Sequence, residues 1–433
     1  MPQPSTTFQP TPPRPTARQV LPVVFLTILL DLLGFGLVIP IAPFYAQQFG
    51  MRPWQITLLA AAFSLMQYFF MPVWGRLSDR IGRRPVILWS VAASCVGYLA
   101  FGLATAAWML FAARLVSGIG NANIGAAQAV IADTTEPHER ARGMGMIGAA
   151  FGIGFILGPV FGGILGKIDL ALPAYVAAGL GAINWVLAYV RMPETLDRTR
   201  VHPQAELAER KDSAELRVLK QQPNVVRLLL VSLIVTIGFA MMEQITGLFV
   251  QHFWVPVPVN ASPALRGELN KHAAVLATAI LAAVGVVMVA IQGGLIGRLT
   301  RKFGEPRLLR VGTATITLGL LLMVGAGTIG WYPGMFVASV VLAAGSALNM
   351  PSLTSLLSRS APPEHQGGLL GTGQSRAALG RVLGPAMAGG LFELEPRLPL
   401  LVGACLALVA FVLSLGVRLP NLGAQTPGLP PTD

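Results

Sequence analysis

Long apolar stretches separated by short polar segments dominate the pattern of the chain. A helix needs about 20 mostly apolar residues to cross about 30 Å of hydrocarbon. About twelve such stretches lie near residues 20–43, 55–77, 86–106, 108–132, 142–166, 170–190, 227–252, 273–298, 308–329, 333–358, 367–392 and 398–418. The pattern therefore predicts an all-α membrane protein with about twelve transmembrane helices.

The composition supports this class. Of the 433 residues, 54% are hydrophobic and 12% are charged, whereas about a quarter of the residues in soluble domains are charged. The net charge of +12 would suggest nucleic acid as the partner of a soluble protein, but here the basic residues lie between apolar segments. Cys95 and Cys405 lie in apolar runs without metal-ligand spacing. We therefore expect no metal, no cofactor and no nucleic-acid partner.

The basic residues also predict the orientation. Of the 31 Lys and Arg residues, 23 lie on one side of the predicted spans, five on the other and three (Arg114, Arg376 and Arg381) inside spans. Loops rich in Lys and Arg stay in the cytoplasm. The asymmetry predicts an even number of spans, both termini in the cytoplasm, and a multi-pass protein of the inner (cytoplasmic) membrane.

Polar segments divide the chain into parts. Residues 1–17 are rich in Pro and Thr and lack the charged start and cleavage site of a signal peptide, so they are interpreted as a disordered cytoplasmic tail. Residues 18–192 and 227–419 each hold about six spans. The mixed charges of 193–226 predict a cytoplasmic linker with a surface helix, and Pro-rich 420–433 a second disordered tail.

An internal repeat joins the two halves. The segment Gly75–Gly82 (GRLSDRIG) recurs as Gly297–Gly304 (GRLTRKFG), and the pattern Gly-x-x-x-Gly-Pro ending at Pro159 recurs with its end at Pro385. Duplicated halves related by an axis along the membrane normal are one plan for secondary transporters, whose substrate binds between the halves at mid-depth.

Four segments, in this order, resemble motifs of the major facilitator superfamily. They are LLDLLGFGLVIPIAP at 29–43, GRLSDRIGRR at 75–84, AARLVSGIGNANIGAA at 112–127 and GMIGAAFGIGFILGPVFGG at 145–163. The first is similar to the first span of twelve-span drug:proton antiporters, which include tetracycline and multidrug exporters. The resemblance implies the major facilitator fold, two pseudo-symmetric six-helix bundles. The second-half copy of the loop motif has Arg301 where the first half has Asp79.

The loop motif predicts a cytoplasmic gate. Its residues are Gly75, Asp79, Arg80, Gly82, Arg83 and Arg84, joined by Asp133 at the end of the fourth span. The resemblance implies that Asp79 faces the N-terminus of the eleventh span, where a helix dipole favours negative charge, and that Arg83 reaches Asp133. The alternative is that these arginines only set the topology, which requires neither the acid nor the glycines.

The fifth predicted span carries an antiporter motif with Gly145, Gly154, Gly158, Pro159, Gly162 and Gly163. Small residues let membrane helices pack closely, and proline bends a helix. We expect a close, bendable contact between the two halves that limits leak during exchange. Ordinary helix packing is the alternative.

Charged residues within the bilayer are costly and usually mark ion or proton pathways. Counting 1.5 Å per residue places Asp31 and Arg114 at similar depths, so they are predicted to pair or to share a cavity. The same count brings Glu243 near Arg381. We interpret these four residues as proton-coupling groups, with static ion pairs as the alternative. SRAALGRVLGP around Arg381 resembles the family's eleventh span.

Polar residues of the central spans are candidates for the substrate cavity. They are Gln67, Asn121, Gln128, Gln244, Asn349 and Arg376. Each of the uncharged ones can equally join helices by hydrogen bonds, and Arg376 is interpreted as a hint of substrate preference.

The sequence contains no G-x-x-x-x-G-K-[ST] loop for ATP, so an ion gradient or the substrate's own gradient must supply the energy. An enzyme is not expected, because the five His residues fall in loops or at span ends. The leading hypothesis is a monomeric, proton-coupled antiporter whose partners are protons, the lipid bilayer and an exported drug-like or amphipathic molecule. The alternatives are an exporter or importer of a metabolite, sugar or siderophore, and a non-transporting receptor.

Overall fold

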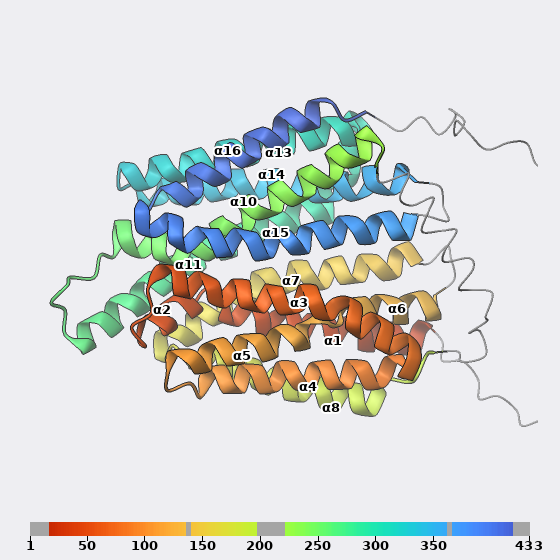
Figure 1. The fold of residues 1–433 in the computed structure, drawn as a ribbon, viewed down its shortest axis with the longest axis horizontal. Helices are drawn as coiled ribbons and strands as arrows, with labels where there is room; N and C mark the ends of the chain where they lie inside the picture. Colours follow the sequence, from red (N-terminus) through yellow and green to blue (C-terminus); the bar gives the residue numbers. More distant parts are fainter. Residues whose placement is uncertain (1–16, 136–139, 197–220, 362–365, 419–433) are drawn as a thin grey trace, which may run out of the picture.

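The computed structural model describes residues 17–135, 140–196, 221–361 and 366–418, and within these ranges the secondary structure is helical (Figure 1). Nine of the described helices are long and apolar enough to cross a membrane. The two predicted tails and the predicted surface helix of the linker lie almost entirely outside the described residues.

Residues of the first half form α1 (Ala17–Val38), α2 (Ala42–Gln47), α3 (Pro53–Ile81), α4 (Arg83–Gly102), α5 (Ala107–Gly120), α6 (Ile124–Thr134), α7 (Arg140–Ile168) and α8 (Leu172–Arg191). Residues of the second half form α10 (Pro223–Trp254), α11 (Pro263–Ala290), α12 (Ile296–Phe303), α13 (Glu305–Thr328), α14 (Tyr332–Arg359), α15 (Gln366–Leu394) and α16 (Leu398–Leu415). Each predicted apolar stretch coincides with helix.

Three stretches depart from single continuous helices. The first ends at Val38, and the short α2 follows Pro40. The fourth is divided by a 3-10 turn at Asn121–Asn123 into α5 and α6. The eighth passes through a π-helical segment, Ile291–Leu295, between α11 and α12. Proline, which lacks an N–H, and polar residues that bond locally account for the first two departures.

The helices form two bundles that lie side by side (Figure 1). The described chain begins and ends at one end of the molecule, which also holds the α3–α4 and α12–α13 turns and is called here the basic end. Gly82 and Gly304 make these two turns with φ of +116° and +75°, a conformation that glycine adopts without strain. The two turns are thus equivalent members of the internal repeat.

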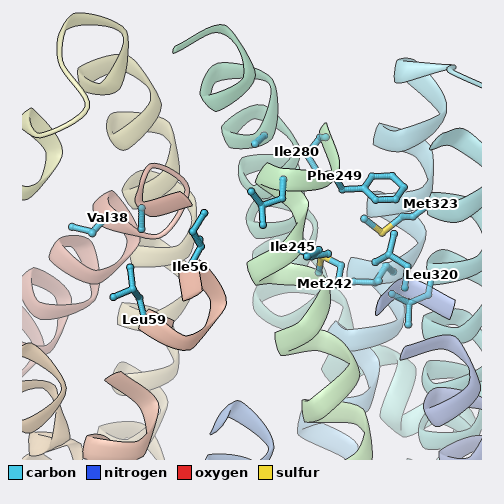
Figure 2. Packing of buried hydrophobic residues seen from close by; sticks show 14 of the residues in the cluster. Val38, Ile56, Leu59, Met242, Ile245, Phe249, Ile280, Leu320 and Met323 are labelled. Atoms are coloured by element: carbon cyan, nitrogen blue, oxygen red, sulfur yellow. The ribbon is translucent and has the colours of Figure 1, made fainter. Parts of the chain in front are cut away.

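Helices α3 and α7 of the first bundle contact α15 and α11 of the second. Buried apolar residues of both bundles belong to one cluster. Figure 2 shows Ile56 and Leu59 of the first bundle and Ile245 of the second among its members.

The bundles are in close contact at the end opposite the basic end. There, a Cβ added to Gly389 of α15 would lie 2.5 Å from the Cα of Trp54 in α3, and Gln47 Nε2 donates to Gln251 Oε1 at 2.6 Å. Toward the basic end, Phe69 and Val73 of α3 are 54% and 42% exposed, and the facing part of α15 is also exposed. The two halves are therefore closed at the opposite end and apart at the basic end.

Candidate functional site

A cavity lies between the two bundles at mid-depth. The first bundle contributes Phe35, Phe63, Gln67 and Arg114 to its lining, and the second contributes Glu243, Gln244 and Arg381. Its volume of about 40 Å³ accommodates a few water molecules and is far below the several hundred Å³ of a drug-sized pocket. In this conformation the site is a polar constriction between the halves.

Arg114 of α5 brings a buried positive charge to this cavity. The residue is 5% exposed, and its guanidinium carbon lies 4.7 Å from the ring centroid of Phe101 and 5.8 Å from that of Phe63. Its Nε is buried without a hydrogen-bond partner among the described residues. Aromatic faces attract a cation without neutralising it, so the charge of Arg114 remains available to the cavity.

Glu243 of α10 and Arg381 of α15 lie together as predicted, since both line the cavity. Within the described residues no ion pair joins them, although both side chains line the same cavity. An acid beside a cation at the meeting point of two halves can exchange a proton for a positively charged guest. Gln67 and Gln244, two of the predicted cavity residues, lie beside them.

The predicted pairing of Asp31 with Arg114 is wrong in this conformation. Asp31 is 7% exposed and accepts hydrogen bonds from Asn123 Nδ2 at 2.7 Å and from Asn184 Nδ2 at 3.0 Å. It does not belong to the lining of the central cavity. Asp31 and Arg114 share a depth, but Asp31 points from α1 toward the 3-10 turn Asn121–Asn123 and α8 within the first bundle.

Four other predicted cavity residues lie elsewhere. Asn121 donates to Ser94 Oγ and Tyr98 Oη, both at 3.1 Å, and so joins helices within the first bundle. Asn349 is 1% exposed and packs against Gly312 between α13 and α14. Gln128 and Arg376 are exposed outside the cavity lining. A polar residue in an apolar stretch is a candidate for a functional role, but the sequence does not indicate whether its side of the helix faces the cavity.

The predicted contact between Arg83 and Asp133 is present at the basic end. Arg83 Nε donates to Asp133 Oδ2 at 3.0 Å and Arg83 Nη1 donates to Ser78 Oγ at 2.8 Å. Asp79, one turn before Arg83, pairs with it as well. The Asp79 side chain is 61% exposed, and in the described part of the chain it makes no contact with the N-terminus of α15, because the halves are apart there. The expected contact of Asp79 with the eleventh span is therefore not made by the described residues in this conformation.

The other residues of the loop motif surround this network. Arg84 Nη2 donates to the carbonyl oxygen of Tyr189 at 2.7 Å. Arg80 is exposed, and a Cβ added to Gly75 would have open space around it. Gly82 has the positive φ described above, and an added Cβ would collide with Glu194.

Glu194 is a functional candidate that the sequence analysis missed. Its carboxylate accepts the backbone N–H of Arg83 at 2.9 Å and that of Arg84 at 3.2 Å. It thereby caps the N-terminus of α4, where Gly82 offers no side chain. The signal in the sequence was an acid directly after the sixth span, on the same side as a helix start without its own cap.

Comparison with known proteins agrees with this geometry. Residues 24–385 and 257–430 match the family model of the Major Facilitator Superfamily. The chain belongs to the Major Facilitator Superfamily. The tetracycline resistance protein, class C, of Escherichia coli is 32% identical over 402 residues, which cover 89% of this chain and 94% of that protein. Multidrug resistance protein 2 of Bacillus subtilis (strain 168) is 28% identical over 91% of this chain and 94% of its own length.

Solved structures share the fold of this superfamily transporter. The crystal structure of the human organic anion transporter MFSD10 (TETRAN) has a TM-score of 0.66 and 24% sequence identity, covering 93% of this chain and all of that chain. A bacterial homolog of the human lysosomal transporter Spinster has a TM-score of 0.72 and 16% identity, covering 96% of this chain and all of that chain. The protein is a multi-pass membrane transporter, not an enzyme.

The second half of the transporter repeats the ion pair of the loop motif with its charges exchanged. Under the repeat, Arg83 corresponds to Glu305 and Asp133 to Arg359. Arg359 Nη1 lies 3.1 Å from Glu305 Oε1, close to the distance of the first pair. Since Arg301 stands at the position of Asp79, all three charges are inverted between the halves.

This inversion predicts how the stability of the transporter responds when the charges at positions 79, 83 and 133 are reversed. We expect Arg83→Glu to destabilise the transporter by on the order of 1–3 kcal/mol, because it faces Asp79 and Asp133 with a like charge in a partly exposed site. The triple variant Asp79→Arg/Arg83→Glu/Asp133→Arg copies the polarity of the second half and should recover most of this loss. Thermal unfolding in detergent measures both effects.

Arg191→Glu, an exposed charge reversal at the same end, is the control. Transport should stay impaired in the triple variant, because an arginine at position 79 cannot be stabilised by the N-terminus of α15 when the basic end closes. A triple variant as unstable as Arg83→Glu alone would show that the pair does not support this turn.

The glycines of α7 act on two different faces of that helix. A Cβ added to Gly158 would lie 2.6 Å from the Cα of Gly36, and one added to Gly162 would lie 2.4 Å from the carbonyl oxygen of Leu37. Both contacts are with α1 inside the first bundle. A Cβ added to Gly163 would lie 2.5 Å from Thr278 Cγ2 of α11, across the boundary between the halves.

The expected contact between the halves is therefore made by only part of the motif. Gly154, like Gly158 and Gly162, lies against α1, and Pro159 lies within α7. Gly145 is in the first turns of α7, but its surroundings lie outside the described residues. The spacing of four residues between Gly154, Gly158 and Gly162 aligns them on one helix face, which explains why they share α1 as a neighbour.

Proposed function

We propose that this transporter is a proton-coupled antiporter that exports drug-like or amphipathic small molecules by alternating access. The observation that carries the proposal is the cavity between the halves, in which Arg114, Glu243 and Arg381 converge. The tetracycline and multidrug resistance proteins among its relatives support drugs as the substrate class.

The proposed topology follows from the distribution of charge. We propose twelve spans in two bundles, residues 18–192 and 227–419, with the basic end and both termini in the cytoplasm of the inner membrane. A monomer contains both halves of the cavity. In this orientation, the separation of the halves at the basic end makes the structure open toward the cytoplasm, the side from which an exported substrate enters.

Exchange requires that the proton and the substrate do not occupy the site together. Glu243 can hold a proton or attract a positively charged substrate, while Arg114 and Arg381 penalise a cation that arrives when the acid is already neutral. Because the constriction holds only about 40 Å³, the substrate must bind where the halves have moved apart. A proton entering down the membrane potential gains about 2.3 kcal/mol per 100 mV, which drives the return step.

Everted membrane vesicles acidified inside provide the test. We expect tetracyclines, lipophilic cations or related compounds to trigger proton release, seen as recovery of a quenched ΔpH-sensitive fluorophore. Glu243→Gln should reduce the initial rate at least tenfold, because glutamine cannot exchange a proton. Glu268→Gln, at an exposed acid of α11, is the matched control and should behave as the unmodified protein. If no compound in the panel releases protons, or if Glu243→Gln is unaffected, the proposed coupling is wrong.

A further inference from the structure

The turn between α12 and α13 carries positive charges that have no acidic partner among the described residues. The basic side chains are Arg298, Arg301, Lys302 and Arg307. Across the described ranges, no acidic side chain forms an ion pair with any of them. The nearest acid in sequence, Glu305, is already held by Arg359 and by Ser355 Oγ at 3.1 Å. As far as the described residues go, these charges are available to an external anion.

An apolar pocket of about 400 Å³ lies beside this turn, between α12, α13 and α14. Its apolar lining consists of Leu299, Phe303, Leu308, Val311 and Leu348. Two arginines complete the lining, but they differ in their freedom. Arg310 donates to the carbonyl oxygens of Ser414, Leu415 and Val417 at the end of α16, whereas Arg307 has no partner among the described residues.

The pocket opens on the outer surface of the second bundle. Phe303 is 42% and Val311 is 52% exposed. Helix α13 is among those long and apolar enough to cross a membrane, and the pocket lies along its first turns at the basic end. An apolar cavity near the basic end, with Arg307 and Arg310 in its lining, matches a ligand with an acyl chain and an anionic headgroup.

We propose that this pocket binds one anionic phospholipid, with an acyl chain against Val311 and Leu348 and the phosphate at Arg307 and Arg301. Charge complementarity favours an anionic over a zwitterionic lipid, because the pocket lining contains two arginines and no acid that could accept an ammonium group. A free phosphate would leave the apolar walls unused. Basic pockets between transmembrane helices are suited to anionic headgroups.

The charge inversion between the halves adds positive charge beside this pocket. In the first half, Asp79 and Asp133 both pair with Arg83. In the second half, the position of Asp79 is occupied by Arg301, so the turn has a surplus of positive charge. The inference does not depend on the transported substrate or on the direction of transport.

Native mass spectrometry of the full-length protein provides the test. The protein is mixed with equal amounts of dioleoylphosphatidylglycerol and dioleoylphosphatidylethanolamine in mild detergent. We expect one phosphatidylglycerol to be retained in preference. Each Lys or Arg near a membrane surface contributes about 1 kcal/mol, about fivefold in affinity. Arg301→Gln/Arg307→Gln should therefore reduce the phosphatidylglycerol adduct by about 25-fold and leave the phosphatidylethanolamine adduct unchanged.

A second variant separates a built site from general charge attraction. Leu348→Trp fills the pocket and keeps every cation, and it should also reduce the phosphatidylglycerol adduct. Val311→Trp, at a more exposed wall position, serves the same purpose if Leu348→Trp does not fold. Arg191→Gln, which removes an exposed charge from the first half at the same end, should retain the lipid.

Three results would overturn the proposal. The first is an unmodified protein that shows no preference for phosphatidylglycerol. The second is an Arg301→Gln/Arg307→Gln variant that retains this lipid fully. The third is a folded pocket-filling variant with unchanged retention, which would show that the cations attract lipid without the pocket.

Discussion

Gly158→Val should push α1 away from α7 and lower the amount of folded transporter in the membrane to a small part of its normal level. At Gly158 the two backbones are so close that even a Cβ would lie 2.6 Å from the Cα of Gly36, and backbone atoms cannot move aside as a flexible side chain can. Overpacking typically costs about 1–3 kcal/mol, and a contact of this kind should reach the upper end or exceed it. Yield after solubilisation and thermal unfolding measure the loss.

Gly179→Val is the matched control, because Gly179 is an exposed glycine of α8 with open space where a Cβ would be. Gly163→Ala makes a further distinction. It meets the Thr278 side chain of the other half, so we expect it to preserve the fold and to slow transport by hindering closure at the end opposite the basic end. If Gly158→Val were as stable as Gly179→Val, the close approach of α1 and α7 would not support the bundle.

The helices could be predicted because their signal is local. Each stretch of about 20 apolar residues must satisfy its backbone hydrogen bonds internally in hydrocarbon, and every predicted stretch is helical. The breaks at Asn121–Asn123 and Ile291–Leu295 could not be predicted in the same way. They interrupt stretches whose overall hydropathy stays high, so the hydropathy pattern alone does not reveal them.

The positions of the charges along the membrane normal were predicted better than the directions in which they point. Counting residues gives depth, and it correctly brought Glu243 and Arg381 to one cavity. The same count placed Asp31 beside Arg114, but each residue also turns a helix by about 100°. The two residues therefore share a depth while facing different neighbours, and only the packing of α1 against α6 and α8 reveals it.

The charge-inverted pairs show information that the sequence already contained. Applying the repeat to Arg83 and Asp133 leads to Glu305 and Arg359 without any structure. A comparison of the two loop motifs alone did not reveal this, because Arg301 at the position of Asp79 suggests that the motif has lost its acid. Together with Glu305 and Arg359, Arg301 shows that all three charges are exchanged in sign. The cap supplied by Glu194 could not be predicted in this way, because it depends on how the end of α8 lies against the start of α4.

Asp31→Asn should abolish uphill export while leaving the transporter folded. Asparagine can remain among Asn123 and Asn184, because Asn184 Oδ1 is buried without a hydrogen-bond partner and can accept from the new amide after rotation. The carboxyl of Asp31 is held by amide donors, so no cation must be released when it gains a proton. This makes it a candidate second proton carrier within the first bundle, distinct from Glu243 in the cavity.

The size of the effect follows from the driving force. Coupling to one net charge moving inward at 100 mV supplies about 2.3 kcal/mol, which supports an about 50-fold substrate gradient. An uncoupled Asp31→Asn protein should support no gradient in everted vesicles and still carry substrate down a preformed one. Asp169→Asn, in an exposed turn where Asp169 Oδ1 accepts the N–H of Ala171, should keep the full gradient. Continued accumulation by Asp31→Asn would mean that Asp31 only braces α1 against α6 and α8, and proton coupling would then rest on Glu243.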